Sequence, residues 1–156
     1  MKRIVFVCHG NICRSPMAEF VMKDLVKKAG KENAYGIRSA AVSSEEEGNG
    51  VYPPARRELE RRGIPWDSAK RAVRLTCADY ARADLFLVMD ESNLVRCKRI
   101  FGGDPDGKVK KLLSYTDRID TDVADPWYTG NFAVAYDDIL EGCTALFSFF
   151  ENGSFT

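Results

Sequence analysis

The chain has 156 residues, enough for a substantial core, and we expect a single domain over residues 1–156. Its 23 basic residues balance 23 acidic ones, so no bulk field favours nucleic acid or a membrane surface as a partner, and no apolar run approaches the roughly 20 residues of a membrane span. Five cysteines without a C-x-x-C pair and one histidine fit neither a disulfide-rich secreted scaffold nor a zinc site, and favour a reducing, cytoplasmic compartment.

Apolar runs and helical periodicities alternate along the chain. The first run, residues 4–7, predicts a buried strand, and Ser15 with Pro16 predicts a helix start, since serine caps helices and proline suits the first helical position. The predicted strands cover residues 4–7, 36–41, 83–89 and 109–113. The predicted helices cover residues 15–28, 53–62, 91–100 and 131–150.

This alternation predicts a three-layer α/β fold, with a central four-stranded parallel sheet and helices on both faces. In such sheets the ligand lies beyond the carboxyl ends of the strands. Cys8 directly follows the first predicted strand, so the loop that it opens lies where a ligand is expected.

The segment from Cys8 to Ser15 predicts a phosphate-binding loop after the first strand. A loop of this length can turn its backbone N–H groups into one hollow that holds a tetrahedral oxyanion at a helix N-terminus. The guanidinium of Arg14 adds a planar fork of donors that matches phosphate oxygens. These groups favour a thiolate, so Cys8 is a candidate nucleophile and the Ser15 hydroxyl a candidate donor to its sulfur. The predicted phosphate-binding residues are His9, Gly10, Asn11, Ile12, Cys13, Arg14 and Ser15.

A phosphate ester also needs a proton for its leaving oxygen. Asp125 is the best candidate acid, because Pro126 stiffens its loop. The aromatic residues Trp127 and Tyr128 follow directly, where they could stack on a flat substrate. Asp122 is a weaker candidate acid. The sequence by itself does not place this loop beside the predicted nucleophile.

The segment Cys8-x-Gly-Asn-Ile-Cys-Arg-Ser-Pro closely resembles the signature of the low-molecular-weight protein tyrosine phosphatases. Residues 89–93 and 125–128 are similar to two further motifs of that family, and the likeness extends from residue 1 to about residue 150. The resemblance implies hydrolysis of phosphotyrosine and small aryl phosphates through a phosphocysteine, with neither metal nor cofactor. Cys8 is then the nucleophile, Arg14 the phosphate clamp, and Asp125 the general acid and later the base.

Further residues take roles from the same resemblance. Ser39, Asn49 and Asp90 match positions that support the phosphate-binding loop or orient its arginine, and Asn11 holds the strained turn of the loop. Cys13 matches a second loop cysteine that forms, in relatives, a reversible disulfide with the nucleophile and protects it from over-oxidation. The alternative for Cys13 is ordinary packing within the loop.

The predicted rim of the site departs from the family pattern. Many relatives carry an aromatic residue where this chain has residues 44–47, with the sequence Ser-Glu-Glu-Glu, so we expect an acidic rim. Tyr52 either replaces the missing aromatic wall or anchors the loop. His9 is expected at the rim, in contact with substrate or solvent. The predicted substrate cleft consists of Glu45, Tyr52, Trp127 and Tyr128.

Several activities stay open beside the leading one. Protein-arginine phosphatases resemble this family and tend to carry Thr in place of Ile12, which favours phosphotyrosine here, although the acidic loop suits a cationic guanidinium. A thioredoxin-linked arsenate reductase needs two further cysteines close together, whereas Cys77 and Cys97 are distant in sequence. A catalytically idle phosphotyrosine-binding module would not need Asp125. We expect a phosphotyrosine-containing protein or peptide as the partner, and a monomer or weak homodimer.

Overall fold

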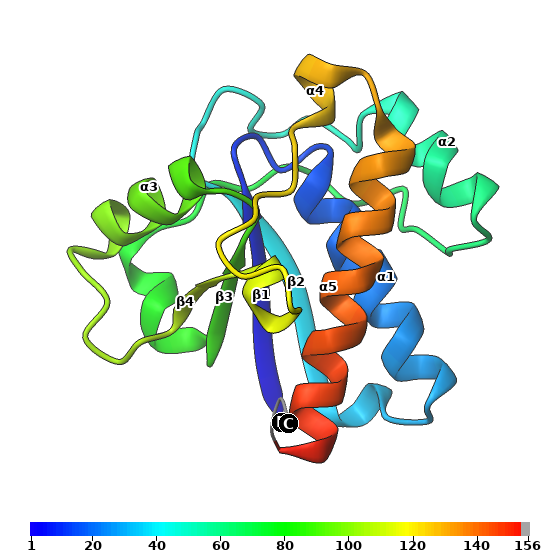
Figure 1. Ribbon diagram of the computed structural model, residues 1–156. Coiled ribbons are helices and arrows are strands. Elements are labelled where there is room, and N and C mark those ends of the chain that lie inside the picture. The colour runs from blue at the N-terminus through cyan, green and yellow to red at the C-terminus, as the bar shows by residue number, and fades with distance from the viewer. Residues whose placement is uncertain (154–156) are drawn as a thin grey trace.

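The computed structural model describes residues 1–153, and residues 154–156 of the predicted domain lie outside the described part. Four parallel strands form one sheet in the order β2-β1-β3-β4 (Figure 1). The strands are β1 (Lys2–Cys8), β2 (Tyr35–Ala41), β3 (Leu85–Val88) and β4 (Val109–Lys111). The α-helices are α1 (Arg14–Lys28), α2 (Pro53–Arg61), α3 (Glu91–Phe101), α4 (Pro126–Thr129) and α5 (Phe132–Asn152). Short 3-10 helices are η1 (Glu32–Ala34), η2 (Cys77–Arg82) and η3 (Leu112–Tyr115).

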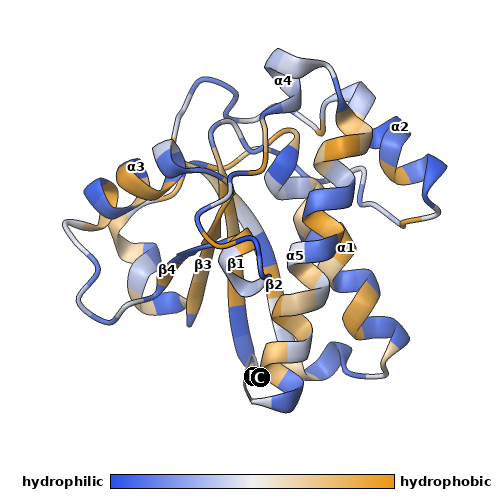
Figure 2. Cartoon of the chain, viewed as in Figure 1, coloured by the Kyte–Doolittle hydropathy of each residue, from blue (hydrophilic) through white to orange (hydrophobic). Residues whose placement is uncertain are grey.

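The central strand β1 is buried on both faces, which explains its unbroken apolar run. Successive strand residues point to opposite faces, so Phe6 belongs to the core under α1 and α5, and Val7 belongs to the core under α3. Helices α1, α2 and α5 cover one side of the sheet and α3 covers the other (Figure 1). In Figure 2, β3 and most of β1 are orange, whereas β4 is mostly blue and bluer residues lie on the outer helices. The predicted three-layer α/β fold with a four-stranded parallel sheet is confirmed.

Several element boundaries differ from the sequence-based expectation. Helix α1 begins at Arg14 with Cys13 at the N-cap position, so Ser15 lies inside the helix and does not cap it. The third strand is shorter than expected, and the fourth ends at Lys111 because the chain turns into η3. Within residues 1–153, no helix combines the length and the apolar character that crossing a membrane requires.

Candidate active site

The loop from Cys8 to Ser15 joins β1 to α1 and directs several donors at one sulfur. Cys8 is 3% exposed, and its Sγ accepts the backbone N–H groups of Asn11 at 3.3 Å and Ser15 at 3.4 Å. The Ser15 hydroxyl lies 2.9 Å from the same sulfur. Since hydrogen bonds to an anion favour the charged form, this arrangement stabilises a thiolate, to which Ser15 is the donor.

The turn of the loop depends on Asn11, which has a φ of 59°, in the left-handed region that asparagine tolerates better than most residues. Its side chain is buried, and both its amide nitrogen and its amide oxygen are hydrogen-bonded. Nδ2 donates to the hydroxyls of Ser15 at 2.8 Å and Ser39 at 2.9 Å, and Oδ1 accepts the N–H of Val73 at 3.1 Å. These contacts hold the loop open around the sulfur.

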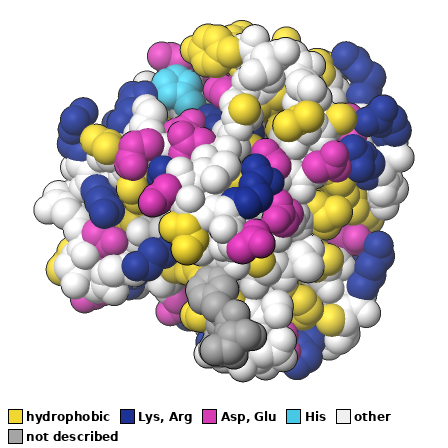
Figure 3. All heavy atoms as spheres, viewed as in Figure 1, with side chains coloured by type: hydrophobic (Ala, Val, Ile, Leu, Met, Phe, Trp, Pro, Cys, Tyr) yellow, Lys and Arg dark blue, Asp and Glu magenta, His cyan; other side chains and the backbone are white. Residues whose placement is uncertain are grey.

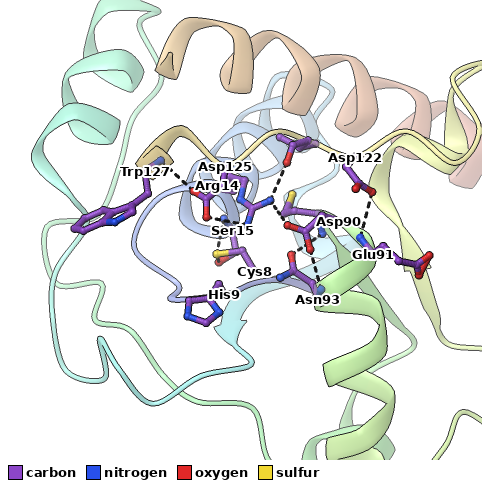
Figure 4. Close-up of polar contacts among 12 residues, drawn as sticks. Cys8, His9, Arg14, Ser15, Asp90, Glu91, Asn93, Asp122, Asp125 and Trp127 are labelled. Carbon is purple, nitrogen blue, oxygen red and sulfur yellow. Dashed lines mark hydrogen bonds and ion pairs between the residues drawn. The ribbon is translucent and has the colours of Figure 1, made fainter. Parts of the chain in front are cut away.

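The Arg14 guanidinium is buried above Cys8 and anchored from α3 and from the loop before α4 (Figure 4). Nη1 donates to Asp90 Oδ2 and to the Val123 carbonyl, both at 2.8 Å, and Nη2 lies 3.4 Å from Asp125 Oδ2. Burial by itself lowers the pKa of Arg14, but Cys8, Asp90 and Asp125 together outweigh burial and raise it. Arg14 therefore stays a fixed cation beside the sulfur.

The two candidate acids lie in different places. Asp125 is the N-cap of α4, where Oδ1 accepts the N–H of Trp127 at 3.1 Å, and its side chain lines the cavity over Cys8. Asp122 instead accepts the N–H of Glu91 at 3.1 Å and pairs with Lys111 at 3.1 Å. Figure 4 shows Asp122 on the far side of Arg14 from Trp127. The structure thus brings Asp125, and not Asp122, to the predicted nucleophile.

One cavity contains the loop, the acid and the aromatic pair. Its floor is formed by Cys8 and Arg14. Trp127 and Tyr128 stand at its mouth, 51% and 84% exposed. The other lining residues are His9, Gly10, Ile12, Cys13, Glu45, Glu46 and Asp125. Tyr52, expected in the cleft, lies behind Trp127, with ring centroids 4.9 Å apart, so it supports the wall without lining it.

The acidic side of the mouth is held by side-chain contacts. Arg96 Nη1 lies 3.0 Å from His9 Nδ1, and His9 Nε2 lies 3.0 Å from Glu45 Oε2. A guanidinium only donates, so Nδ1 accepts and the hydrogen on Nε2 points at Glu45. Figure 3 shows acidic side chains (magenta) beside the histidine (cyan). Arg96, on α3, gave no sequence signal, because it is one charged residue on an amphipathic helix.

The predicted supporting residues contact the loop to different degrees. Ser39 binds Asn11 directly and Asp90 binds Arg14 directly. Asn49 does not: its amide donates to Glu46 Oε2 at 2.6 Å on the exposed side of the acidic loop. The side chain of Glu46 packs near Gly10, where an added Cβ would lie 3.3 Å from it. The Asn49 carbonyl also accepts the N–H of Ala72 at 2.8 Å, and Ala72 packs against Ile12 and Cys13, so Asn49 reaches the catalytic loop indirectly.

Cys13 is the second thiol of the cavity and is buried. Burial, followed by the charges of Cys8 and Asp125, raises the pKa of Cys13 strongly, and Arg14 opposes this only in part. Cys13 is therefore a neutral thiol. Among residues 1–153, no three His, Cys, Asp or Glu side chains gather closely enough to hold a metal ion.

Known proteins share this architecture. A model of the family described as low molecular weight phosphotyrosine protein phosphatase matches residues 3–153. The low molecular weight protein-tyrosine-phosphatase YfkJ of Bacillus subtilis is 36% identical over 147 residues, which are 94% of this chain and 94% of that protein. The crystal structure of YfkJ superposes with a TM-score of 0.93 at 34% identity, covering 99% of this chain and 97% of that one. The structure of a Drosophila arginine phosphatase superposes with a TM-score of 0.86 at 28% identity, covering 97% and 98%.

Proposed function

The chain belongs to the low molecular weight phosphotyrosine protein phosphatase family, and on that premise we propose that it hydrolyses phosphotyrosine in proteins through a phosphocysteine intermediate. The observation that carries the proposal is the Cys8 sulfur, which accepts two backbone N–H groups on the floor of a cavity that Arg14 and Asp125 also line. Transfer of a phosphoryl group to a thiolate requires a nucleophilic sulfur, a cation and an acid, and Cys8, Arg14 and Asp125 supply these three groups.

In the first step the Cys8 thiolate attacks phosphorus as the bond from phosphorus to the phenolic oxygen breaks. The phosphoryl oxygens are bound by the loop N–H groups and by those Arg14 N–H groups that do not donate to Asp90 or Val123. These donors stabilise the charge on the oxygens. Asp125 gives its proton to the departing oxygen, which leaves as tyrosine. The products of this step are phosphocysteine, tyrosine and the Asp125 carboxylate.

In the second step the Asp125 carboxylate takes a proton from water, and the water oxygen attacks phosphorus. The sulfur–phosphorus bond breaks and its electron pair returns to Cys8, where the Ser15 hydroxyl at 2.9 Å stabilises the thiolate. Inorganic phosphate leaves, and Asp125 is protonated again. The cycle needs no group beyond these side chains and water.

Phosphoarginine is the second candidate substrate. Glu45 and Glu46 line the mouth and would attract a guanidinium, and the likeness to the Drosophila arginine phosphatase agrees with this choice. Phosphotyrosine is preferred because Trp127 and Tyr128 offer exposed aromatic faces at the same mouth. We also place the enzyme in the cytoplasm, a reducing compartment that suits its five free cysteines. We propose in addition that it works without a cofactor and as a monomer or weak homodimer.

The test is the release of phosphate from phosphotyrosine, phosphoarginine and phosphoserine peptides of matched sequence. We expect turnover of the phosphotyrosine peptide and loss of that turnover in Cys8→Ser. A higher kcat/KM on phosphoarginine would replace the main proposal with the second one. Activity retained by Cys8→Ser would overturn the assignment of the nucleophile. Gel filtration at micromolar and millimolar protein separates a monomer from a weak homodimer.

A further inference from the structure

Three side chains from three separate segments meet on one side of the cavity mouth, and the reaction steps above use none of them. Arg96 comes from α3, His9 from the catalytic loop and Glu45 from the acidic loop after β2. Each of the two contacts between them is 3.0 Å long. In Figure 3 the histidine (cyan) lies at the surface, with acidic (magenta) and basic (dark blue) side chains beside it. His9 is thus held between a cation and an anion at the entrance to the site.

The two contacts fit only a neutral imidazole. Arg96 donates to Nδ1, which must therefore carry no hydrogen, and the hydrogen on Nε2 is the one that Glu45 accepts. A protonated ring carries a hydrogen on both nitrogens, so Nδ1 and the guanidinium would be two cationic donors facing each other. The contact with Glu45 would at the same time become a full ion pair. Protonation of His9 therefore breaks the contact with Arg96 and strengthens the contact with Glu45.

The surroundings of the ring allow such a change. Histidine is the side chain that ordinarily changes its charge between about pH 5 and 8. The side chain of His9 is 36% exposed, so it exchanges protons with solvent. Arg96 and Glu45 are the charged groups that touch the ring. The other charged groups around the cavity are Glu46, the Cys8 thiolate, Arg14 and Asp125.

The two states of His9 present different charges to a substrate. When the ring is neutral, Arg96 is occupied by Nδ1, and Glu45 keeps an exposed carboxylate that attracts a cation. When the ring is protonated, its positive charge neutralises Glu45. Arg96, which forms no ion pair within residues 1–153, is then released as a cation beside the mouth. The mouth thus changes from a site for basic side chains into a site for acidic ones.

We propose that His9 and Arg96 are specificity-determining residues that make substrate choice depend on pH. With His9 neutral, the enzyme prefers phosphotyrosine peptides with Lys or Arg beside the phosphotyrosine. With His9 protonated, released Arg96 shifts the preference toward peptides with Asp or Glu there. The inference deepens the proposed function and rests on it.

The test uses two phosphotyrosine peptides that differ only in carrying Lys or Glu beside the phosphotyrosine. The ratio of their kcat/KM values, Lys peptide over Glu peptide, is measured from about pH 5.5 to 8. Titration of the catalytic groups acts on both peptides and cancels in this ratio. His9 is the one histidine of the chain, so its ring-proton NMR resonance reports its protonation directly.

As the pH falls, we expect the ratio to fall by about four- to 25-fold, the product of two exposed ion pairs worth about two- to five-fold each. One pair is lost at Glu45 and one is gained at Arg96. The midpoint of the change is expected at the pH at which the His9 resonance titrates.

Three variants separate the charge of His9 from other effects. His9→Gln offers an oxygen to Arg96 and an NH₂ group to Glu45 but cannot gain a proton. Its ratio therefore keeps only the pH dependence that flanking charges impose on the second ionisation of the phosphate, near pH 6. Arg96→Met removes the released cation, so the change shrinks to about two- to five-fold. Arg99→Met, exposed on α3 and outside the cavity lining, removes the same charge and keeps the wild-type change.

Each other outcome overturns the inference. An active wild-type enzyme whose ratio follows that of His9→Gln at every pH shows that the charge of His9 does not select substrates. A midpoint that departs from the NMR titration of His9 assigns the change to another group. A full change in Arg96→Met removes Arg96 from the device. If the wild-type protein releases no phosphate from either peptide while its His9 resonance still titrates, the proposed function itself fails, and the inference fails with it.

Discussion

The buried guanidinium of Arg14 donates a 2.8 Å hydrogen bond to Asp90 Oδ2, while the other oxygen of Asp90 accepts the N–H of Asn93 at 2.8 Å. Asp90 is the N-cap of α3, so the start of one helix sets the orientation of an arginine on another. The contact spans 76 positions in sequence and connects the α3 side of the sheet to the α1 side.

Asp90→Ala is therefore expected to lower kcat. The free energy of unfolding should fall by little more than the loss of a helix N-cap costs. Without this anchor Arg14 keeps the Val123 carbonyl but loses the carboxylate that fixes its plane. A displacement of about 1 Å at such a group costs on the order of 100-fold in rate. The measurement is kcat on p-nitrophenyl phosphate. The control is Ser92→Ala, two residues after Asp90 in the first turn of α3, which is expected to keep the wild-type rate.

Asp125→Asn is expected to lower kcat on phosphotyrosine by about 10²- to 10⁴-fold, since it removes the proton for the leaving oxygen. The loss grows as the leaving phenol becomes less acidic, which a series of aryl phosphates measures. Asp122→Asn is the matched control, because Asp122 is held by Lys111 and Glu91 away from the cavity. An equal loss for every leaving group would argue against the acid role of Asp125.

The first strand and its loop were predictable because local sequence determines them. An unbroken apolar run, as in residues 4–7, is needed wherever both faces of a strand are covered, and the segment from Cys8 to Ser15 carries its donors within eight consecutive positions. Ser15 was misassigned as a helix cap, since serine suits both a cap and a donor inside the first turn. Sequence alone does not distinguish these roles.

Contacts between distant segments were not predictable. Arg96 meets His9 across 87 positions, and Glu19 meets Ser39 across 20. Nothing in the periodicity of α1 distinguishes Glu19 from a solvated charge, because its burial depends on where β2 runs. The position of Tyr52 behind Trp127 was not predictable for the same reason, because it depends on how α4 returns over the loop.

The acidic mouth is expected to favour phosphotyrosine peptides with Lys or Arg beside the phosphorylated residue. Glu45 has an exposed carboxylate with only a neutral imidazole donor on it, so it can still pair with a cation. The measurement is the ratio of the KM values for peptides with neutral and with basic flanking residues. The double variant Glu45→Gln with Glu46→Gln is expected to reduce this ratio by about two- to five-fold for each exposed ion pair between a carboxylate and the peptide that is lost. Glu47→Gln, which lies on the same loop outside the cavity lining, keeps the preference.

Mild peroxide is expected to join Cys8 and Cys13 in a disulfide. Peroxide oxidises the Cys8 thiolate to a sulfenic acid, and the neutral Cys13 thiol in the same cavity then displaces water from it. Peptide mass mapping detects the bond, and thiol reductant restores activity. Cys13→Ser is expected to carry Cys8 on to the sulfinic acid, with activity that reductant does not recover. Sulfinic acid in the wild-type protein without the disulfide would contradict a protective role.

The ionised carboxylate of Asp104, which is remote from the active site, is expected to stabilise the fold and to lose this effect at acid pH. The carboxylate accepts the Tyr80 hydroxyl at 2.7 Å and, at the start of β4, the N–H groups of Lys108 at 2.7 Å and Val109 at 3.1 Å. Burial by itself raises the pKa of Asp104, but these hydrogen bonds outweigh burial and lower it. A carboxyl with a lowered folded-state pKa stabilises the fold fully above its ordinary pKa and loses that contribution as pH falls through the folded value.

Asp104→Asn should therefore lower the free energy of unfolding by about 1–3 kcal/mol at pH 7, because the amide cannot accept on both sides. The difference from wild type should shrink as the pH falls below about 4, where the wild-type carboxyl begins to bind its proton. Urea unfolding at pH 7 and at acid pH measures both values. Asp106→Asn, in the same turn, is the control because only its backbone N–H contacts Tyr80. A difference that is constant with pH would mean that the Asp104 charge contributes nothing to stability.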